Sequence, residues 1–123
     1  MQRETLDAIR ANAIAKGDVL GVARVAGIMA AKRTSELIPL CHPIPLSDIR
    51  IDLAFDDALP GLRVEATAKT AAQTGVEIEA MVAVSVTLVT VYDMAKAVDR
   101  SMVIGEISLA EKLGGRSGHW IKP

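Results

Sequence analysis

The chain has 123 residues and a formal net charge of −1, and half of its residues are hydrophobic although only 2% are aromatic. Acidic and basic residues are interspersed, so the sequence offers neither a basic stripe nor aromatic platforms for a nucleic acid, and we expect no nucleic-acid partner. The length fits one domain, residues 1–123. Because the core must be built from small aliphatic side chains, we expect further burial by oligomerisation.

The sequence also argues against a membrane or secreted location. No apolar run long enough to span a bilayer is free of charged residues, and the first residues lack the apolar segment of a signal peptide. The single cysteine, Cys41, excludes an intrachain disulfide, which is typical of a reducing compartment. We therefore expect a cytoplasmic protein with no membrane partner.

Two helices are predicted in the first third of the chain. Apolar residues recur at helical spacing over residues 4–14 and again over residues 19–32. Between them, Gly17 suits a left-handed helix end and Asp18 can cap the second helix. Residues 33–48 form a proline-rich connection that is long for a compact domain, which suggests a functional loop.

Alternating apolar and polar residues then predict a hairpin, with strands at residues 49–55 and 62–68. A long helix is expected from about residue 74 to about residue 99. It is apolar nearly all round as far as Val91, so we expect it to be buried against both the sheet and another subunit. Residues 103–109 are predicted to form a last strand, and residues 114–118 a glycine-rich loop.

The order of these elements predicts an α+β sandwich, with an antiparallel sheet and helices packed on one face. A ferredoxin-like arrangement would also need a strand before the first helix, and the sequence shows none there.

Residues 37–43, Leu-Ile-Pro-Leu-Cys-His-Pro, hold the only cysteine and one of two histidines. Prolines on both sides keep Cys41 and His42 out of regular elements, which favours the wall of a ligand site. A lone cysteine is also often a small buried hydrophobe, and a lone histidine a hydrogen-bonded scaffold residue. Cys41, His42 and His119 lack the spacing of zinc ligands, so we expect no metal site.

Charged residues mark both ends of the long helix. Glu77 and Glu79 suit the dipole at its start, but Glu79 could equally accept two hydrogen bonds from a guanine-like edge. Asp93 and Lys96 share a face as either a surface ion pair or an acid–base carboxylate beside a phosphate-binding ammonium. Since Glu79 and Asp93 would lie roughly 20 Å apart along a helix, a site that used both would be assembled most simply from two subunits.

Three other cationic positions have a structural and a functional interpretation. Lys16 could meet a phosphate at the start of the second helix or belong to an ordinary turn. Lys32 and Arg33 suit the dipole at that helix's end, or could contact a ligand. Lys112 could form an anion nest with the glycine-rich run around Arg116, or simply flank a turn.

Together these segments resemble the cyclic pyranopterin monophosphate synthase family of molybdenum-cofactor biosynthesis, also called MoaC. The resemblance covers nearly the whole chain in order, and its most specific parts are LIPLCHP at 37–43, GVEIEA at 75–80 and YDMAKAV at 92–98. It implies a ferredoxin-like fold and a homohexamer, a trimer of dimers with the active site at a subunit interface. It also implies a lyase that needs neither cofactor nor metal.

The implied reaction converts (8S)-3',8-cyclo-7,8-dihydroguanosine 5'-triphosphate to cyclic pyranopterin monophosphate with release of diphosphate. The resemblance assigns acid–base catalysis to Asp93, substrate binding to residues 40–42, Ile78 and Glu79, and further polar roles to Lys16, Glu77 and Lys96. With the positions singled out above, the candidate catalytic residues are Asp93, Lys96, Lys16 and His42. The candidate substrate-binding residues are Leu40, Cys41, His42, Glu77, Ile78, Glu79, Lys32 and Lys112.

One departure leaves an alternative open. Members of the family begin earlier, with a strand-like segment, so the resemblance implies a shortened form without the N-terminal strand. The alternative function is a non-catalytic oligomeric nucleotide-binding or regulatory domain derived from the family.

Overall fold

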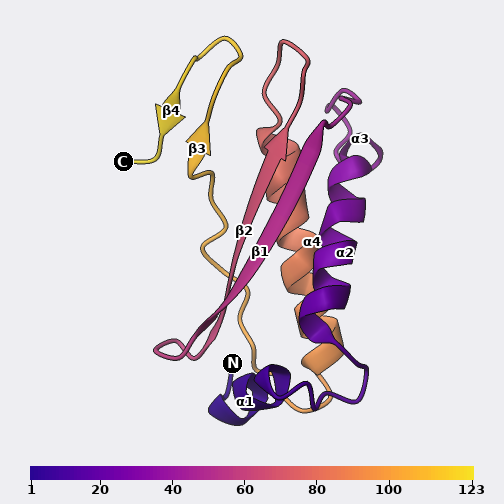
Figure 1. The fold of residues 1–123 in the computed structure, drawn as a ribbon, viewed down its shortest axis with the longest axis vertical. Helices are drawn as coiled ribbons and strands as arrows, with labels where there is room; N and C mark the ends of the chain where they lie inside the picture. The colour runs from indigo at the N-terminus through magenta and orange to yellow at the C-terminus, as the bar shows by residue number, and fades with distance from the viewer.

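Two long helices lie side by side against one face of a two-stranded antiparallel sheet in the computed structural model, which describes residues 1–123 (Figure 1). The helices are α1 (Arg3–Arg10), α2 (Val19–Lys32), α3 (Thr34–Leu37) and α4 (Glu77–Ala95). The strands are β1 (Asp48–Asp56), β2 (Gly61–Lys69), β3 (Glu111–Lys112) and β4 (Trp120–Ile121). The predicted α+β class is confirmed, and the arrangement is consistent with a ferredoxin-like fold.

Local chemistry explains where the first helices begin and end. Asp18 caps α2 as predicted, because its carboxylate accepts a hydrogen bond of 3.1 Å from the backbone N–H of Gly21. Gly17 takes the left-handed conformation, with φ +113°, in the connection before this cap. The first helix is shorter than expected and ends at Arg10, since Asn12 is already left-handed at φ 54°.

The predicted hairpin is also confirmed. β1 and β2 pair in a continuous antiparallel register from Asp48 opposite Lys69 to Asp56 opposite Gly61. Ile51 is buried beneath the helices, whereas its neighbours Arg50 and Asp52 are exposed on the other face, as the alternating pattern predicts.

Small residues let α2 and α4 approach closely. A Cβ placed on Gly27 would lie 2.5 Å from Ile51 Cδ1 and 2.9 Å from the carbonyl oxygen of Ala83. Ala83 and Thr87 form the facing surface of α4, and both are fully buried. The core can therefore be dense without aromatic side chains.

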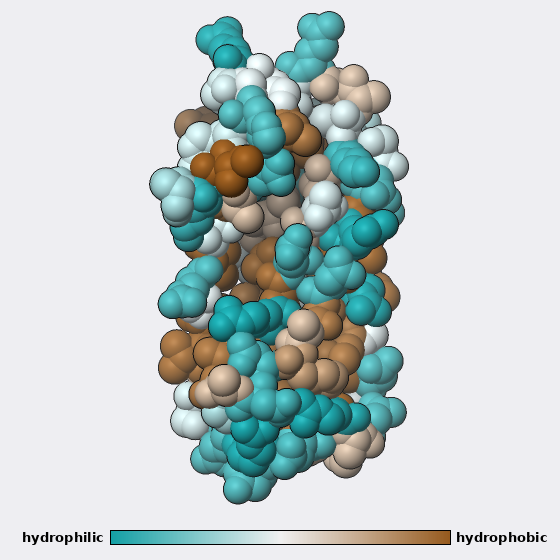
Figure 2. Space-filling view, turned by 60° about the vertical axis from the view of Figure 1, so that its left-hand side comes forward, coloured by the Kyte–Doolittle hydropathy of each residue, from teal (hydrophilic) through white to brown (hydrophobic).

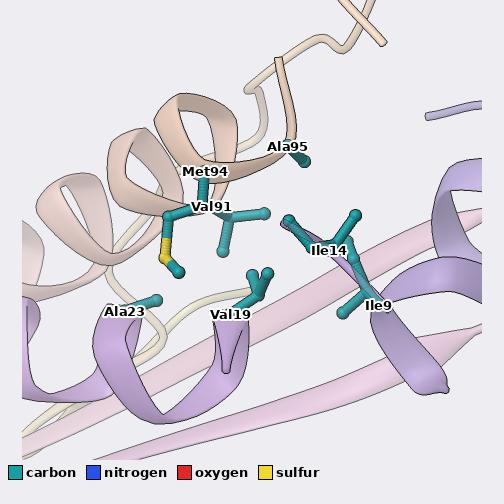
Figure 3. Close-up of a cluster of buried hydrophobic side chains, with 7 residues drawn as sticks. All are labelled: Ile9, Ile14, Val19, Ala23, Val91, Met94 and Ala95. Atoms are coloured by element: carbon teal, nitrogen blue, oxygen red, sulfur yellow. The ribbon is translucent and has the colours of Figure 1, made fainter. Parts of the chain in front are cut away.

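A second part of the core closes the end of the molecule near α1. Figure 3 shows Val91, Met94 and Ala95 of α4 facing Val19 and Ala23 of α2, with Ile9 and Ile14 beside them. Ile14 belongs to the connection between α1 and α2, and its side chain is 8% exposed. This anchored residue fixes the position of the loop that carries Lys16.

The helix α4 is shorter at both ends than predicted, because the backbone is helical only from Glu77 to Ala95. By length and composition α4 could cross a bilayer, but this is weak evidence because the core helix of a soluble protein passes the same test. Here one side of α4 packs along α2 and the sheet. Its outer side includes Val89, which is 56% exposed, so the expected burial on all sides is not complete within one chain.

The predicted strand at residues 103–109 is wrong. These residues belong to no strand, and the two short strands of the C-terminal region lie further on, at β3 and β4. Glu106 has φ 56°, a left-handed conformation that interrupts the extended backbone of a regular β-strand, and Gly105 precedes it. The alternation of side chains is therefore not sufficient to define a strand, because no neighbouring strand pairs with this segment.

Asp99 ties the segment after α4 to the start of α1. Its carboxylate is 3% exposed and accepts hydrogen bonds from Gln2 N–H at 2.8 Å, Thr5 Oγ1 at 3.0 Å and Ser101 Oγ at 2.7 Å. The hydrogen bond from Gln2, followed by those from Ser101 and Thr5, outweighs the effect of burial and lowers the pKa of Asp99 to about 2.

This carboxylate makes stability depend on pH. With a pKa of about 2 when folded and about 3.9 when unfolded, ionised Asp99 stabilises the fold by about 2–3 kcal/mol. The contribution is complete above the unfolded pKa and is lost as the pH falls through the folded pKa. We expect Asp99→Asn to lower the free energy of unfolding by roughly that amount near neutral pH. Denaturant titrations at neutral and strongly acidic pH would check this, and an equal loss at both would contradict it.

Candidate active site

Asp93 lies at the centre of a charged cluster at the C-terminal end of α4. Its Oδ1 accepts a hydrogen bond from Lys96 Nζ at 2.8 Å, and its Oδ2 accepts one from Lys16 Nζ at 3.2 Å. Lys16 also donates to the backbone carbonyl of Asp93 at 3.3 Å. Lys96 reaches Asp93 because residues three apart share a helix face, whereas Lys16 is delivered by the connection before α2.

The two lysines determine the charge state of Asp93. Hydrogen bonds from Lys96 and then Lys16, together with their positive charges, hold the pKa of Asp93 below its ordinary value. Near neutral pH it is a carboxylate, as an unperturbed aspartate would also be, and it can accept a proton. All three side chains are about half exposed, so these ion pairs contribute little to stability.

The first turn of α4 carries a second polar group. Glu79 is only 3% exposed although it is charged, and the Cys41 thiol lies 3.8 Å from its Oε2. The helix dipole favours a carboxylate at this position. Burial, followed by the negative charge and hydrogen bond of Glu79, raises the pKa of Cys41, so the thiol stays protonated and can donate to the carboxylate.

A cavity of about 250 Å³ opens beside Glu79. Its other walls come from the end of α2, from α3 and from the proline-rich connection. The lining residues are Ala31, Lys32, Thr34, Ser35, Pro43, Ile44, Pro45 and Glu79. The volume is below the roughly 300–1,000 Å³ of small-molecule sites, so the cavity of one chain can hold only part of a nucleotide.

An ion pair between Glu77 and Lys112 joins the start of α4 to β3. Lys112 Nζ lies 3.2 Å from Glu77 Oε1, and both side chains are less than one-third exposed. Lys112 also lies 3.5 Å from Ser117 Oγ in the glycine-rich loop. The other carboxylate oxygen of Glu77, Oε2, is buried and has no hydrogen-bond partner. An unsatisfied buried oxygen is costly, which is typical of a functional position.

The chain is similar to proteins of one known family over nearly its whole length. Residues 1–115 match the MoaC family. Curated proteins from Brucella ovis, Brucella melitensis and Brucella abortus, each named cyclic pyranopterin monophosphate synthase, are 59% identical over 120 residues. The match covers 98% of this chain and 73% of each relative. The chain belongs to the MoaC family.

Within this MoaC protein, eight of the eleven predicted site residues fall into two groups. One contains Lys16, Asp93 and Lys96, which are in mutual contact through Asp93. The other contains Cys41, Glu77, Glu79, Lys32 and Lys112 around the start of α4. The groups do not meet, because fourteen residues of helix, about 21 Å, separate Glu79 from Asp93.

Three predicted residues of the MoaC chain lie on the surface. Leu40 is 93% exposed, Ile78 is 37% exposed, and His42 is exposed without a hydrogen bond to another residue through its ring. None of them lines the cavity beside Glu79, although Pro43 from the same segment does. Their predicted role in substrate binding is therefore separate from this cavity.

Sequence reasoning missed Ser35, which lines the cavity, and Ser117, which contacts Lys112. Ser35 lies between Lys32 and the 37–43 segment, so its place in that run was an available signal. Nothing in the sequence pattern distinguishes Ser117 from other loop residues of a MoaC chain.

Proposed function

We propose that this chain is a cyclic pyranopterin monophosphate synthase of molybdenum-cofactor biosynthesis. It is a lyase that converts (8S)-3',8-cyclo-7,8-dihydroguanosine 5'-triphosphate to cyclic pyranopterin monophosphate and releases diphosphate. The observation that carries the proposal is the 59% identity to proteins named for this activity, which extends over 98% of the chain. That identity does not favour a non-catalytic nucleotide-binding domain.

The Asp93 cluster supplies the groups for proton transfer and phosphate chemistry. Asp93 is the proposed acid–base residue, and as an ionised carboxylate held between two lysines it would accept a proton at the start of the cycle. Expelling diphosphate and closing a cyclic phosphate both develop negative charge on phosphoryl oxygens. Lys16 and Lys96 are already held beside Asp93 and would stabilise that charge.

The Glu79 end would recognise the guanine-derived ring. A buried carboxylate whose only side-chain donor is a thiol can accept hydrogen bonds from two adjacent N–H groups of a ligand. Lys32 lies on the wall of the same cavity, and Lys112 lies next to Glu77. We assign all four residues to substrate binding, together with residues 40–42 and Ile78, and we give His42 a role in proton transfer.

A single site that uses both groups needs a second subunit. In an antiparallel pairing of α4 helices, the Glu79 end of one protomer would lie near the Asp93 end of its partner. Apolar residues are exposed on both long helices, Val89 on α4 and Val22, Val25 and Met29 on α2, which supports a buried contact with another subunit. Brown apolar patches also interrupt the charged surface on the face seen in Figure 2. We propose a cytoplasmic homohexamer, a trimer of dimers.

The test is diphosphate release from purified protein supplied with the cyclised nucleotide. We expect stoichiometric release of diphosphate, measured by a coupled colorimetric assay. We also expect formation of cyclic pyranopterin monophosphate, detected by mass spectrometry. The Lys96→Ala variant, which removes one phosphate-facing ammonium, is the matched inactive control. Binding of the nucleotide without diphosphate release would favour the non-catalytic domain and contradict the proposal.

A further inference from the structure

Gly75 lies between the partners of the Lys112–Glu77 ion pair. A Cβ placed on Gly75 would overlap Glu77 Oε2 and would lie 2.6 Å from Lys112 Cε. Both separations are far shorter than a van der Waals contact. The two side chains therefore occupy the space that any residue other than glycine would need.

The overlapping atoms are the ends of two flexible side chains, not backbone atoms. An alanine at this position would therefore displace the Glu77 carboxylate and the Lys112 stem while α4 stays in place. Gly27 offers the contrast, since a Cβ there would press on the carbonyl oxygen of Ala83. A Cβ at Gly27 would therefore destabilise the packing of α2 on α4, whereas a Cβ at Gly75 would disrupt only the Lys112–Glu77 ion pair.

The glycine-rich loop completes the same contact from the other side. Gly115 has φ +69°, and a Cβ built on it would lie 3.5 Å from Lys112 Nζ and 3.6 Å from the backbone nitrogen of Gly75. The loop and the residues before α4 thus enclose the lysine. Within this enclosure, the ammonium of Lys112 meets the opposite charge of Glu77 at 3.2 Å.

We infer that Gly75 is a positioning residue, which keeps Lys112 aligned on Glu77 for use by the substrate. The inference rests on the proposed function, because it takes Lys112 and Glu77 as parts of the substrate site. Gly75 touches no substrate itself. It acts by leaving room, so that Glu77 Oε2 packs against the glycine while Oε1 holds the ammonium of Lys112 at 3.2 Å.

The test compares Gly75→Ala and Gly75→Val with Gly105→Ala. Gly105 is the matched control, because nothing lies within 4 Å of a Cβ built there. We expect kcat/KM for diphosphate release to fall by about 10- to 100-fold for Gly75→Ala, further for Gly75→Val, and not for Gly105→Ala. The melting temperature of Gly75→Ala should lie below that of Gly105→Ala by no more than the small contribution of one ion pair. Equal kcat/KM for these two variants would overturn the inference.

A second measurement does not depend on activity. The coupling between Lys112 and Glu77 can be measured by thermal unfolding of Lys112→Ala, Glu77→Gln and the double variant, first in the wild-type chain and then in the chain that carries Gly75→Ala. We expect the coupling to be present in the first series and lost in the second. An unchanged coupling would overturn the role of Gly75. A wild-type protein without diphosphate release would instead overturn the proposed function, and this cycle would still test the glycine.

Discussion

Replacing Asp93 by asparagine is expected to reduce diphosphate release by about 10²- to 10⁴-fold, the usual contribution of a positioned acid–base group. An asparagine keeps the size of the side chain and can still accept a hydrogen bond from Lys96, which now lies at 2.8 Å. It cannot take a proton. The loss would therefore appear in kcat, measured by steady-state diphosphate release, more than in binding of the nucleotide.

The control is Asp52→Asn, which removes an exposed carboxylate from β1 that makes no side-chain hydrogen bond. We expect it to leave turnover unchanged. Melting temperatures of both variants should stay close to wild type, because the ion pairs of Asp93 are about half exposed. Near-full turnover of Asp93→Asn would remove the acid–base assignment and leave Asp93 as a residue that positions Lys16 and Lys96.

The Asp93 cluster also shows how far local spacing can predict a site. The contact of Asp93 with Lys96 follows from their separation of three residues on a helix and was predicted. The contact with Lys16 spans 77 residues and depends on how the connection before α2 packs. The burial of Ile14, which no short motif signals, contributes to that position together with Gly17 and the Asp18 cap.

Where the prediction failed, the cause was a requirement that is not local. The alternation in residues 103–109 is compatible with a strand, but a strand also needs an edge with which to pair. The backbone at Glu106 is left-handed instead, and the segment stays outside the sheets. The helix and hairpin patterns were reliable because α2, β1 and β2 are each defined by contacts within or next to their own segments.

Asp99 is the converse case. By sequence it was only the expected end of the long helix, yet it is one of the few buried charged residues and accepts hydrogen bonds from the N-terminal residues and from the neighbouring Ser101. The partners Gln2 and Thr5 lie more than 90 residues away in sequence, so no window of local sequence could have revealed them.

Two inactive variants are expected to restore activity when they share a dimer. If each site takes its Glu79 end from one protomer and its Asp93 end from the other, Glu79→Gln and Asp93→Asn homodimers have two defective sites each. A mixed dimer places both substitutions in one site and leaves the other intact. Co-expression with two affinity tags would isolate the mixed dimers, and their diphosphate release should approach half of the wild-type rate.

The control is a mixed dimer of two variants whose substitutions lie at the same end of α4. It distinguishes a site shared between subunits from recovery that any mixing of variants would produce. Asp93 and Lys96 lie at the same end of α4, where Lys96 Nζ is 2.8 Å from Asp93 Oδ1. A mixed dimer of Asp93→Asn and Lys96→Ala would therefore have one substitution in each site and should stay inactive. Recovery in both pairings would indicate subunit exchange or contamination. Failure of the Glu79→Gln and Asp93→Asn pair to recover would contradict the shared site. It would then mean that Glu79 and Asp93 do not serve one site, because a straight helix cannot bring groups about 21 Å apart to one small molecule within one chain.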